Sequence, residues 1–261
     1  MAYVESRCAD GVLTITFNRP EVHNAFNDAF SDELSVALED ARRRDDAKVV
    51  VLRGEGKSFC SGRDFREMGE RPPGVSHHDY MIEGQKTIKR MLDMGKPMIA
   101  ALKGAVYGGG CEYALVCDVR ISAPTTRMAM PEVNYGLAVD QGGSALAASL
   151  IGPSRTKWML MTGDPVDAQT ALAWGMVDFI VPLEELDSHV DALARKIAAK
   201  PRQAMMAAKN LVDELWSDGV RAAIRRELQQ QLALFASDDF EALRERRRAD
   251  KAAKAAASAA S

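Results

Sequence analysis

Two glutamates and a run of glycines have the residue types and spacing of a general acid–base site. The triple glycine Gly108–Gly110 precedes a segment with helical character, and Glu112 follows Gly109 by three residues. One helical turn therefore brings the Glu112 carboxylate close to whatever the glycine amides hold. Glu132 lies 20 residues later, beside a proline. Two carboxylates in one site can supply both the base and the proton donor that acid–base chemistry needs.

The glycines themselves predict an anion-binding site. Backbone N–H groups at a helix N-terminus can approach a ligand closely when no side chain interferes, and the helix dipole there favours negative charge. A tight loop without a ligand is the alternative interpretation of Gly108–Gly110. For Glu112 the alternative is an acid that only stabilises the helix dipole, and for Glu132 it is a surface acid after proline.

The N-terminal part of the chain, which must help to position these residues, alternates strands with helical segments. This alternation suggests βα units. Val12–Phe17 alternates apolar and Thr side chains between turn sequences, so it is expected to be a strand. Asn27 can cap a helix that runs to about Arg44, and Lys48–Leu52 is expected to be a buried strand. The apolar residues of that helix share one face, namely Phe30, Leu34, Ala37, Leu38 and Ala41.

The rest of the chain is expected to be mostly helical. Residues 69–78 should form a surface loop, followed by a helix over 79–93. A short strand is expected at Val177–Val181, and the Ala/Lys/Ser run 250–261 is expected to be frayed or disordered because it lacks large apolar groups. Further helices are expected at Arg155–Thr162, Asp167–Trp174, Leu183–Ala199, Gln203–Trp216 and Gly219–Phe235.

Five segments, in the same order along the chain, resemble the crotonase (enoyl-CoA hydratase/isomerase) superfamily. They are FNRPEVHNAFN at 17–27, KSFCSGRDFREM at 57–68, GAVYGGGCE with the later PEVNYGLAVDQGG, TGDPVDAQTALAWGMVDFIVP at 162–182, and AAK at 207–209. The resemblance implies an α/β fold, a crotonase-like ββα spiral with a C-terminal helical region. The core would span residues 1–195 and the helical region residues 196–261.

The resemblance also implies how a thioester is held. The backbone amides of Arg63 and Gly109 would form an oxyanion hole for the thioester carbonyl of an acyl-CoA. Coenzyme A would enter as part of the substrate, so no separate cofactor is expected. Its contacts are expected from Ser61, Gly62, Asp64, Phe65, Arg66 and Gly108. Arg66 could equally be a solvated surface arginine, and Arg244–Arg248, a second candidate for the phosphates, could be a charged helix face.

Both Glu112 and Glu132 are present, as in the hydratases of this family, which implies addition of water to a 2-enoyl-CoA or the reverse dehydration. Glu112 would activate water and Glu132 would be the proton-donating partner. Asp140 follows Glu132 by eight residues, where several isomerases of the family, and some of its dehydratases, carry a third carboxylate. The alternative is therefore a double-bond isomerase that uses Glu132 and Asp140. Asp140 could also simply cap a helix that starts around Gln141.

Composition excludes several other classes of protein. The chain has 261 residues and a net charge of −3, which argues against a nucleic-acid partner and against an RNA-binding role for this fold. It has neither an apolar run long enough to span a membrane nor the pattern of a signal or transit peptide, so a cytoplasmic location is expected. Val51 stands where a phosphate loop ending at Lys57 needs its first glycine.

Cysteine and histidine spacing predicts no metal site. The four cysteines have no C-x-x-C spacing and are expected to be reduced thiols. Assembly into homotrimers or homohexamers is implied by the resemblance. Periodicity indicates only that the C-terminal helices have apolar faces that need a partner.

Overall fold

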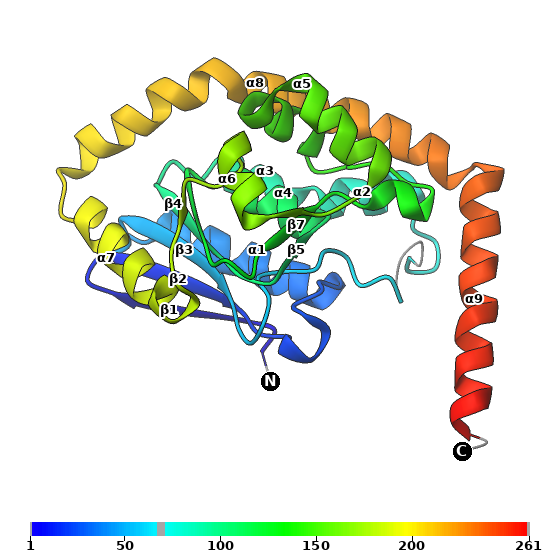
Figure 1. Cartoon of the computed structure of the whole chain (residues 1–261). Coiled ribbons are helices and arrows are strands. Elements are labelled where there is room, and N and C mark those ends of the chain that lie inside the picture. The colour runs from blue at the N-terminus through cyan, green and yellow to red at the C-terminus, as the bar shows by residue number, and fades with distance from the viewer. Residues whose placement is uncertain (1, 67–70, 260–261) are drawn as a thin grey trace.

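A six-stranded sheet forms one layer of the protein (Figure 1). The computed structural model describes residues 2–66 and 71–259. β1 pairs with β2 antiparallel, and every other pairing in this sheet is parallel. In spatial order its strands are β1 (Val4–Ala9), β2 (Val12–Phe17), β3 (Val49–Gly54), β4 (Met98–Leu102), β6 (Val119–Ser122) and β9 (Phe179–Ile180).

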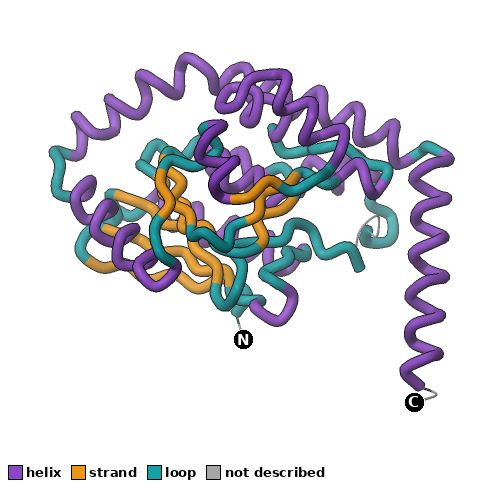
Figure 2. The backbone as a smooth tube through the Cα atoms, in the orientation of Figure 1, coloured by secondary structure: helices purple, strands orange, loops and turns teal. Residues whose placement is uncertain are grey.

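A smaller sheet carries the segment that leads to the triple glycine. It contains β5 (Ala105–Tyr107), β7 (Arg127–Ala129) and β8 (Val166–Asp167), with β5 and β7 parallel. Because β5 ends at Tyr107, the chain passes directly from this sheet into the helix that follows Gly108. In Figure 2 the strands of both sheets lie below the long helix α8 (Arg202–Phe235), which crosses the top of the view.

Local sequence signals predicted the first elements well. β2 has the predicted bounds, and β3 lies within one or two residues of the prediction. α1 (Asp28–Arg43) is capped by Asn27, whose side-chain oxygen accepts a hydrogen bond of 3.0 Å from the Phe30 amide. The residues that α1 buries are the five apolar residues predicted to share one face.

The main sheet is buried on both faces, as expected of parallel strands. Alternate residues of β2 and β3 belong to two separate apolar clusters: Leu13 and Leu52 face α1, whereas Val12 and Val51 face α7 (Leu186–Ala198). The sheet therefore forms a rigid base from which loops and short helices reach the site.

Several predicted helix bounds were wrong. The helix expected over 79–93 is two helices, α2 (His77–Gly84) and α3 (Lys86–Leu92), separated at Gln85. The helix expected over Arg155–Thr162 is the part of α5 (Gly143–Thr162) that follows the kink at Gly152 (φ 77°, ψ 163°), and it ends where predicted; the part before the kink was not predicted. Residues 71–76 form a loop as predicted, and residues 67–70 lie outside the described part of the chain.

The remaining short elements connect these layers. The helix expected over Asp167–Trp174 is α6 (Ala168–Trp174), and Asp167 caps it by accepting a hydrogen bond from the Thr170 amide. The strand expected over 177–181 is the shorter β9. The elements not yet described are α4 (Gly109–Leu115) and the 3-10 turns η1 (Pro20–Val22), η2 (Glu132–Tyr135) and η3 (Leu183–Glu185).

The C-terminal region is more continuous than predicted. One helix, α8 (Arg202–Phe235), replaces the two helices expected on either side of Asp218, and it crosses the molecule alongside α5 (Figure 1). α9 (Asp238–Ala259) extends away from the body, so the run from 250 to 259 is helical and not frayed as predicted. Alanine and lysine favour helix even without large apolar groups.

Candidate active site

The first helical residue of α4 presents a backbone amide to a cavity. Gly108 has φ 53° and ψ −130°, a conformation that glycine adopts without strain. Gly109 then opens the helix, so its N–H has no acceptor within α4. Both glycines line a cavity of about 940 Å³. This is the helix N-terminus that the sequence predicted as an anion-binding site.

The loop at Ser61–Asp64 presents a second amide to the same cavity. The Phe26 amide donates to the Gly62 carbonyl at 2.9 Å, and the Asp64 amide donates to the Phe26 carbonyl at 2.8 Å. Since N–H directions alternate along an extended segment, the amide of Arg63 points away from Phe26. Arg63 and Gly109 both line the cavity.

Two glycines with positive φ allow these two segments to touch. Gly62 has φ 89°, and a Cβ on it would lie 2.7 Å from the Tyr107 carbonyl oxygen and 3.5 Å from the Gly108 Cα. A side chain at Gly62 would therefore force the segments apart, whereas one at Gly108 would press on the Glu132 carboxylate, 3.0 Å away. The close approach brings together the two segments that carry Arg63 and Gly109, as the expected oxyanion hole requires.

Glu112 is fully buried one turn into α4, next to these amides. Its Oε1 accepts hydrogen bonds from the Gln141 amide at 3.0 Å and from the Gly143 amide at 2.8 Å. Its Oε2 has no partner among the described residues. Burial, together with the negative charges of Asp140 and other nearby acids, raises the pKa of Glu112 well above its usual value. One oxygen therefore orients the carboxyl group and the other is unpartnered, although Glu112 itself is not among the described residues that line the cavity.

Glu132 lies beside Gly108, the first residue of the triple glycine. It opens the turn η2, and its Oε1 is 3.0 Å from the position that a Cβ on Gly108 would take. It lines the cavity, and its Oε2 has no partner among the described residues. Burial, with a smaller effect of the nearby acids, raises the pKa of Glu132 to about 8. Glu132 can therefore hold a proton at neutral pH, as a general acid must.

Asp140 joins the two glutamates and does not cap a helix. α5 begins at Gly143, with Gly142 as its cap, so the prediction of a helix starting at Gln141 was wrong. Asp140 lines the cavity, where burial and the charge of Glu227 raise its pKa to about 7. The Arg63 guanidinium opposes that shift. The site thus contains a third acid.

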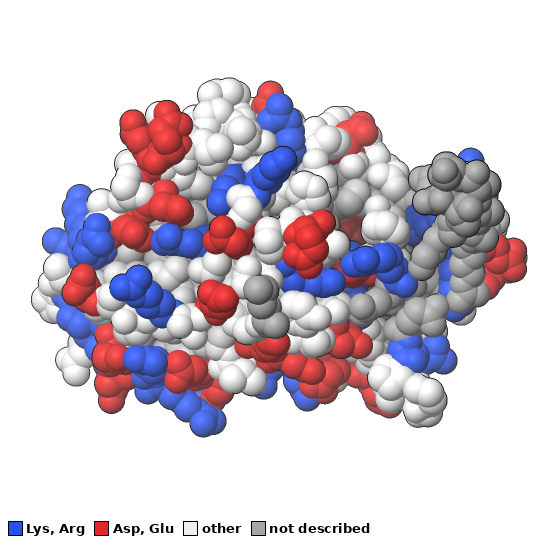
Figure 3. Space-filling model, turned by 90° about the horizontal axis from the view of Figure 1, so that it is seen from below, with Lys and Arg blue, Asp and Glu red and all other residues white. Residues whose placement is uncertain are grey.

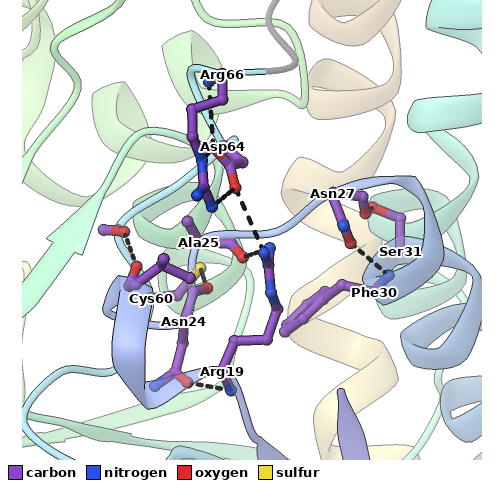
Figure 4. A network of polar contacts seen from close by, with 11 residues as sticks. Arg19, Asn24, Ala25, Asn27, Phe30, Ser31, Cys60, Asp64 and Arg66 are labelled. Carbon is purple, nitrogen blue, oxygen red and sulfur yellow. Dashed lines mark hydrogen bonds and ion pairs between the residues drawn. The ribbon is translucent and has the colours of Figure 1, made fainter. Parts of the chain in front are cut away.

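The residues expected to contact coenzyme A all line the same cavity: Ser61, Gly62, Asp64, Phe65, Arg66 and Gly108. Figure 4 shows that Arg66 folds back onto Asp64, with hydrogen bonds of 2.8 and 2.6 Å. Asp64 also contacts Arg19 at 3.4 Å, and the Arg66 guanidinium lowers the pKa of Asp64. A ligand phosphate would have to share Arg66 with this carboxylate.

The basic segment Arg244–Arg248 lies on α9, outside the lining of this cavity. Arg247 donates to the Asn134 carbonyl at 2.8 Å and lies over the Tyr135 ring. Figure 3 shows acidic and basic side chains interspersed on the face that it displays. In the described part of the chain, no cluster of His, Cys, Asp and Glu has the geometry of a metal site, and no helix is long and apolar enough to cross a membrane.

Sequence reasoning missed the contribution of α8 to the site. Glu227 and Gln231 are buried on the same helical face as Val220 and Ile224. Glu227 accepts hydrogen bonds from the amides of Gly142 and Ser144. Two polar residues four positions apart in an apolar stripe were the available signal, because buried polar groups need partners.

Comparison with known proteins agrees with this geometry. Residues 7–251 match the family model described as enoyl-CoA hydratase/isomerase. The chain belongs to the enoyl-CoA hydratase/isomerase family. Its similarity to characterised members extends over most of its length, which confirms the predicted crotonase-like α/β fold with a C-terminal helical region.

Two relatives in the family illustrate its range. The short-chain-enoyl-CoA hydratase of Clostridium acetobutylicum is 30% identical over 229 residues, covering 87% of each chain. The 1,2-epoxyphenylacetyl-CoA isomerase of Escherichia coli is 31% identical over 205 residues, covering 77% of this chain and 78% of the other. A solved enoyl-CoA hydratase/isomerase from Xanthobacter autotrophicus superposes with a TM-score of 0.86 at 29% identity, covering 94% of this chain and 93% of that chain.

Proposed function

We propose that this protein is an enoyl-CoA hydratase, which adds water to a 2-enoyl-CoA thioester or catalyses the reverse dehydration. One observation carries the proposal: Glu132 lines the same cavity as Arg63 and Gly109, whose amides can bind one carbonyl oxygen, and Glu112 lies one helical turn after Gly109. The hydratase relative at 30% identity supports the same activity.

The chemistry follows from these groups. Amides at 63 and 109 would stabilise the negative charge that develops on the thioester oxygen when the substrate becomes an enolate. Glu112, held by Oε1, would in its ionised form take a proton from water through its unpartnered Oε2. The new C–O bond forms at the β carbon. The α carbon then takes a proton from Glu132, whose raised pKa keeps that proton available at neutral pH.

Coenzyme A is expected to bind as the carrier of the acyl group. Backbone and side-chain groups of Ser61–Arg66 line the cavity beside the oxyanion amides, so they are the proposed contacts for pantetheine and phosphates. No separate cofactor is needed for the addition of water, since the two acids supply every proton transfer.

A second candidate function is double-bond isomerisation. Asp140 lines the cavity and has a pKa near 7, so it could pass a proton to a carbon further along the acyl chain. The isomerase relative supports this candidate. In that case Glu132 and Asp140, instead of Glu112 and Glu132, would be the working pair.

Mass spectrometry of the acyl-CoA pool separates the two functions. We expect incubation with crotonyl-CoA to convert it to a product heavier by one water. When the reaction runs in ¹⁸O-water, that product should contain ¹⁸O. Conversion of a 3-enoyl-CoA to a 2-enoyl-CoA at unchanged mass, with crotonyl-CoA left intact, would instead establish the isomerase. Failure to convert any 2- or 3-enoyl-CoA would refute both proposals.

We also propose that the protein is cytoplasmic and assembles into homotrimers or homohexamers. The first half of α8 exposes Leu211, Val212 and Leu215 on the surface of a single chain, and such an apolar stripe is typical of an interface. Light scattering is expected to give about three or six times the chain mass of 28.5 kDa. A purified protein that scatters as a monomer at micromolar concentration would contradict the assembly.

A further inference from the structure

A buried glutamate of α8 reaches the turn that orients the catalytic acid. Glu227 is 7% exposed. Its Oε2 accepts a hydrogen bond of 2.6 Å from the Gly142 amide, and its Oε1 accepts from the amide and the hydroxyl of Ser144. These groups belong to the N-terminus of α5, where orphan amides and the helix dipole favour a negative charge.

The amides of this turn alternate between two glutamates. Gln141 and Gly143 donate to Glu112, whereas Gly142 and Ser144 donate to Glu227. The turn is therefore clamped between α4 and α8. A change in the position of Glu227 must move the amides that hold Oε1 of Glu112, since they belong to adjacent peptide units.

Other residues tie the same loop to α8. Gln231, one turn after Glu227, accepts a hydrogen bond of 3.0 Å from the Ala138 amide. Gln85 donates to the Asp140 carbonyl at 2.7 Å and to the Ile224 carbonyl at 3.3 Å. The loop that carries Asp140 is thus fixed from α8 at both ends.

Glu227 is also close enough to act on the site by its charge. Its negative charge adds to burial in raising the pKa values of Glu112, Glu132 and Asp140. Asp140 and Glu132 also raise the pKa of Glu112. Burial, with smaller effects of Glu132 and Glu112, raises the pKa of the neighbouring Cys111 thiol. The cation that opposes them at Asp140 is the Arg63 guanidinium.

We propose that Glu227 is a positioning residue for hydration, which orients Glu112 through the Gln141–Ser144 turn and whose negative charge acts on the proton donor Glu132. This inference rests on the proposed function, because it assigns Glu227 a part in that reaction. Catalysis would then depend on a residue of α8, which lies far in sequence from Glu112 and Glu132.

Replacement of Glu227 by Gln tests the charge, and Glu33 supplies the matched control. Glu33 also accepts hydrogen bonds from two backbone amides, those of Tyr3 and Val4, but lies outside the cavity lining. For Glu227→Gln we expect kcat to fall about 10- to 100-fold with KM little changed, since the acids and not the CoA contacts are disturbed. Glu33→Gln should leave both constants unchanged.

The pH profile separates this role from simple structural support. Removal of a negative charge stabilises the ionised form of the remaining acids, so their pKa values fall. The basic limb of kcat/KM, where the proton donor becomes ionised, is expected to move down by about one pH unit in Glu227→Gln. Glu227→Asp keeps the charge but shortens the side chain, so it should lose turnover while retaining the wild-type profile.

Thermal unfolding gives a readout that does not require activity. Glu132 and Asp140 have pKa values of about 8 and 7 in the folded protein, above their ordinary values of 4.5 and 3.8. The folded state therefore binds more protons than the unfolded state across this window, and stability should fall as pH rises from about 4 to 8. The fall should be shallower in Glu227→Gln than in Glu33→Gln or wild type.

The outcomes are distinct. Loss of turnover in Glu227→Gln with an unshifted pH profile and an unchanged stability slope would overturn the proposed role. If Glu227→Gln does not fold, a pH profile in Glu227→Asp that differs from the wild type would overturn it. A wild type that hydrates no enoyl-CoA would refute the proposed function, while the stability slopes would still test the effect of the Glu227 charge.

Discussion

Glu132→Gln is expected to lower kcat for hydration of a 2-enoyl-CoA by about 10³- to 10⁴-fold, the upper range for loss of a general acid or base. The substituted amide keeps the size of the side chain but cannot give up a proton with a pKa near 8. Glu112→Gln should have an effect of similar size, because an amide cannot take a proton from water. KM should change little in either variant.

The glutamine variants are also expected to fold. In Glu112→Gln the retained side-chain oxygen can still accept from the Gln141 and Gly143 amides, while the new NH₂ group replaces an oxygen without a partner in the described residues. The exposed Glu214 on α8 offers a control, and Glu214→Gln should match the wild type in steady-state kinetics. Retention of even a tenth of wild-type kcat in both active-site variants would exclude this acid pair.

Gly143→Ala is expected to reduce kcat at least 100-fold by a purely steric route. A Cβ at this position would lie 2.6 Å from Oε1 of Glu112 and 3.1 Å from its carboxyl carbon. Glu112 is fully buried, so it can yield only by losing its hydrogen bonds to the turn. Overpacking of this kind costs about 1–3 kcal/mol of stability. Denaturant unfolding and steady-state kinetics on the same preparation measure both effects.

Gly219→Ala is the matched control for this substitution. Gly219 lies inside α8, and among the described residues no atom beyond the adjoining helix backbone lies within 4 Å of an added Cβ. Alanine in a helix interior is favoured over glycine by about 0.5–1 kcal/mol, so this variant should be more stable and fully active. If Gly143→Ala kept wild-type kcat, the orientation of Glu112 by the turn before α5 would be unimportant for turnover.

The elements that local signals specify were predictable from sequence. Asn27 is a side-chain cap, and β2 has alternating apolar residues, so both could be located without knowledge of the rest of the chain. The start of α5 could not be located from local sequence. Its capping groups are Glu112 and Glu227, which come from other helices, and Gly142 leaves no side-chain signal.

Long-range packing explains the other differences. Gly219 suggested a break between two helices in the region that forms the single helix α8. Val220 and Ile224 are, however, buried on the same face of α8. That burial outweighs the roughly 1 kcal/mol that glycine costs.

In the candidate site, too, local spacing predicts the positions of some residues, whereas tertiary contacts decide the positions of others. The position of Glu112 follows from its spacing to Gly109, whereas the position of Glu132 over Gly108 was implied only by the family resemblance. Glu227 lies 85 residues from its partner Gly142, and no local pattern connects the two. The division into residues 1–195 and 196–261 stays a prediction, as do the roles of the six proposed coenzyme A contacts.

A crystal structure with a bound acyl-CoA, such as a 3-hydroxyacyl-CoA product, tests the central claim most directly. The thioester oxygen should lie about 2.7–3.1 Å from the amide nitrogens of both Arg63 and Gly109, with Glu112 and Glu132 on either side of the adjoining carbons. A thioester bound elsewhere in the cavity, or one that reaches these amides with neither glutamate near its α and β carbons, would contradict the account.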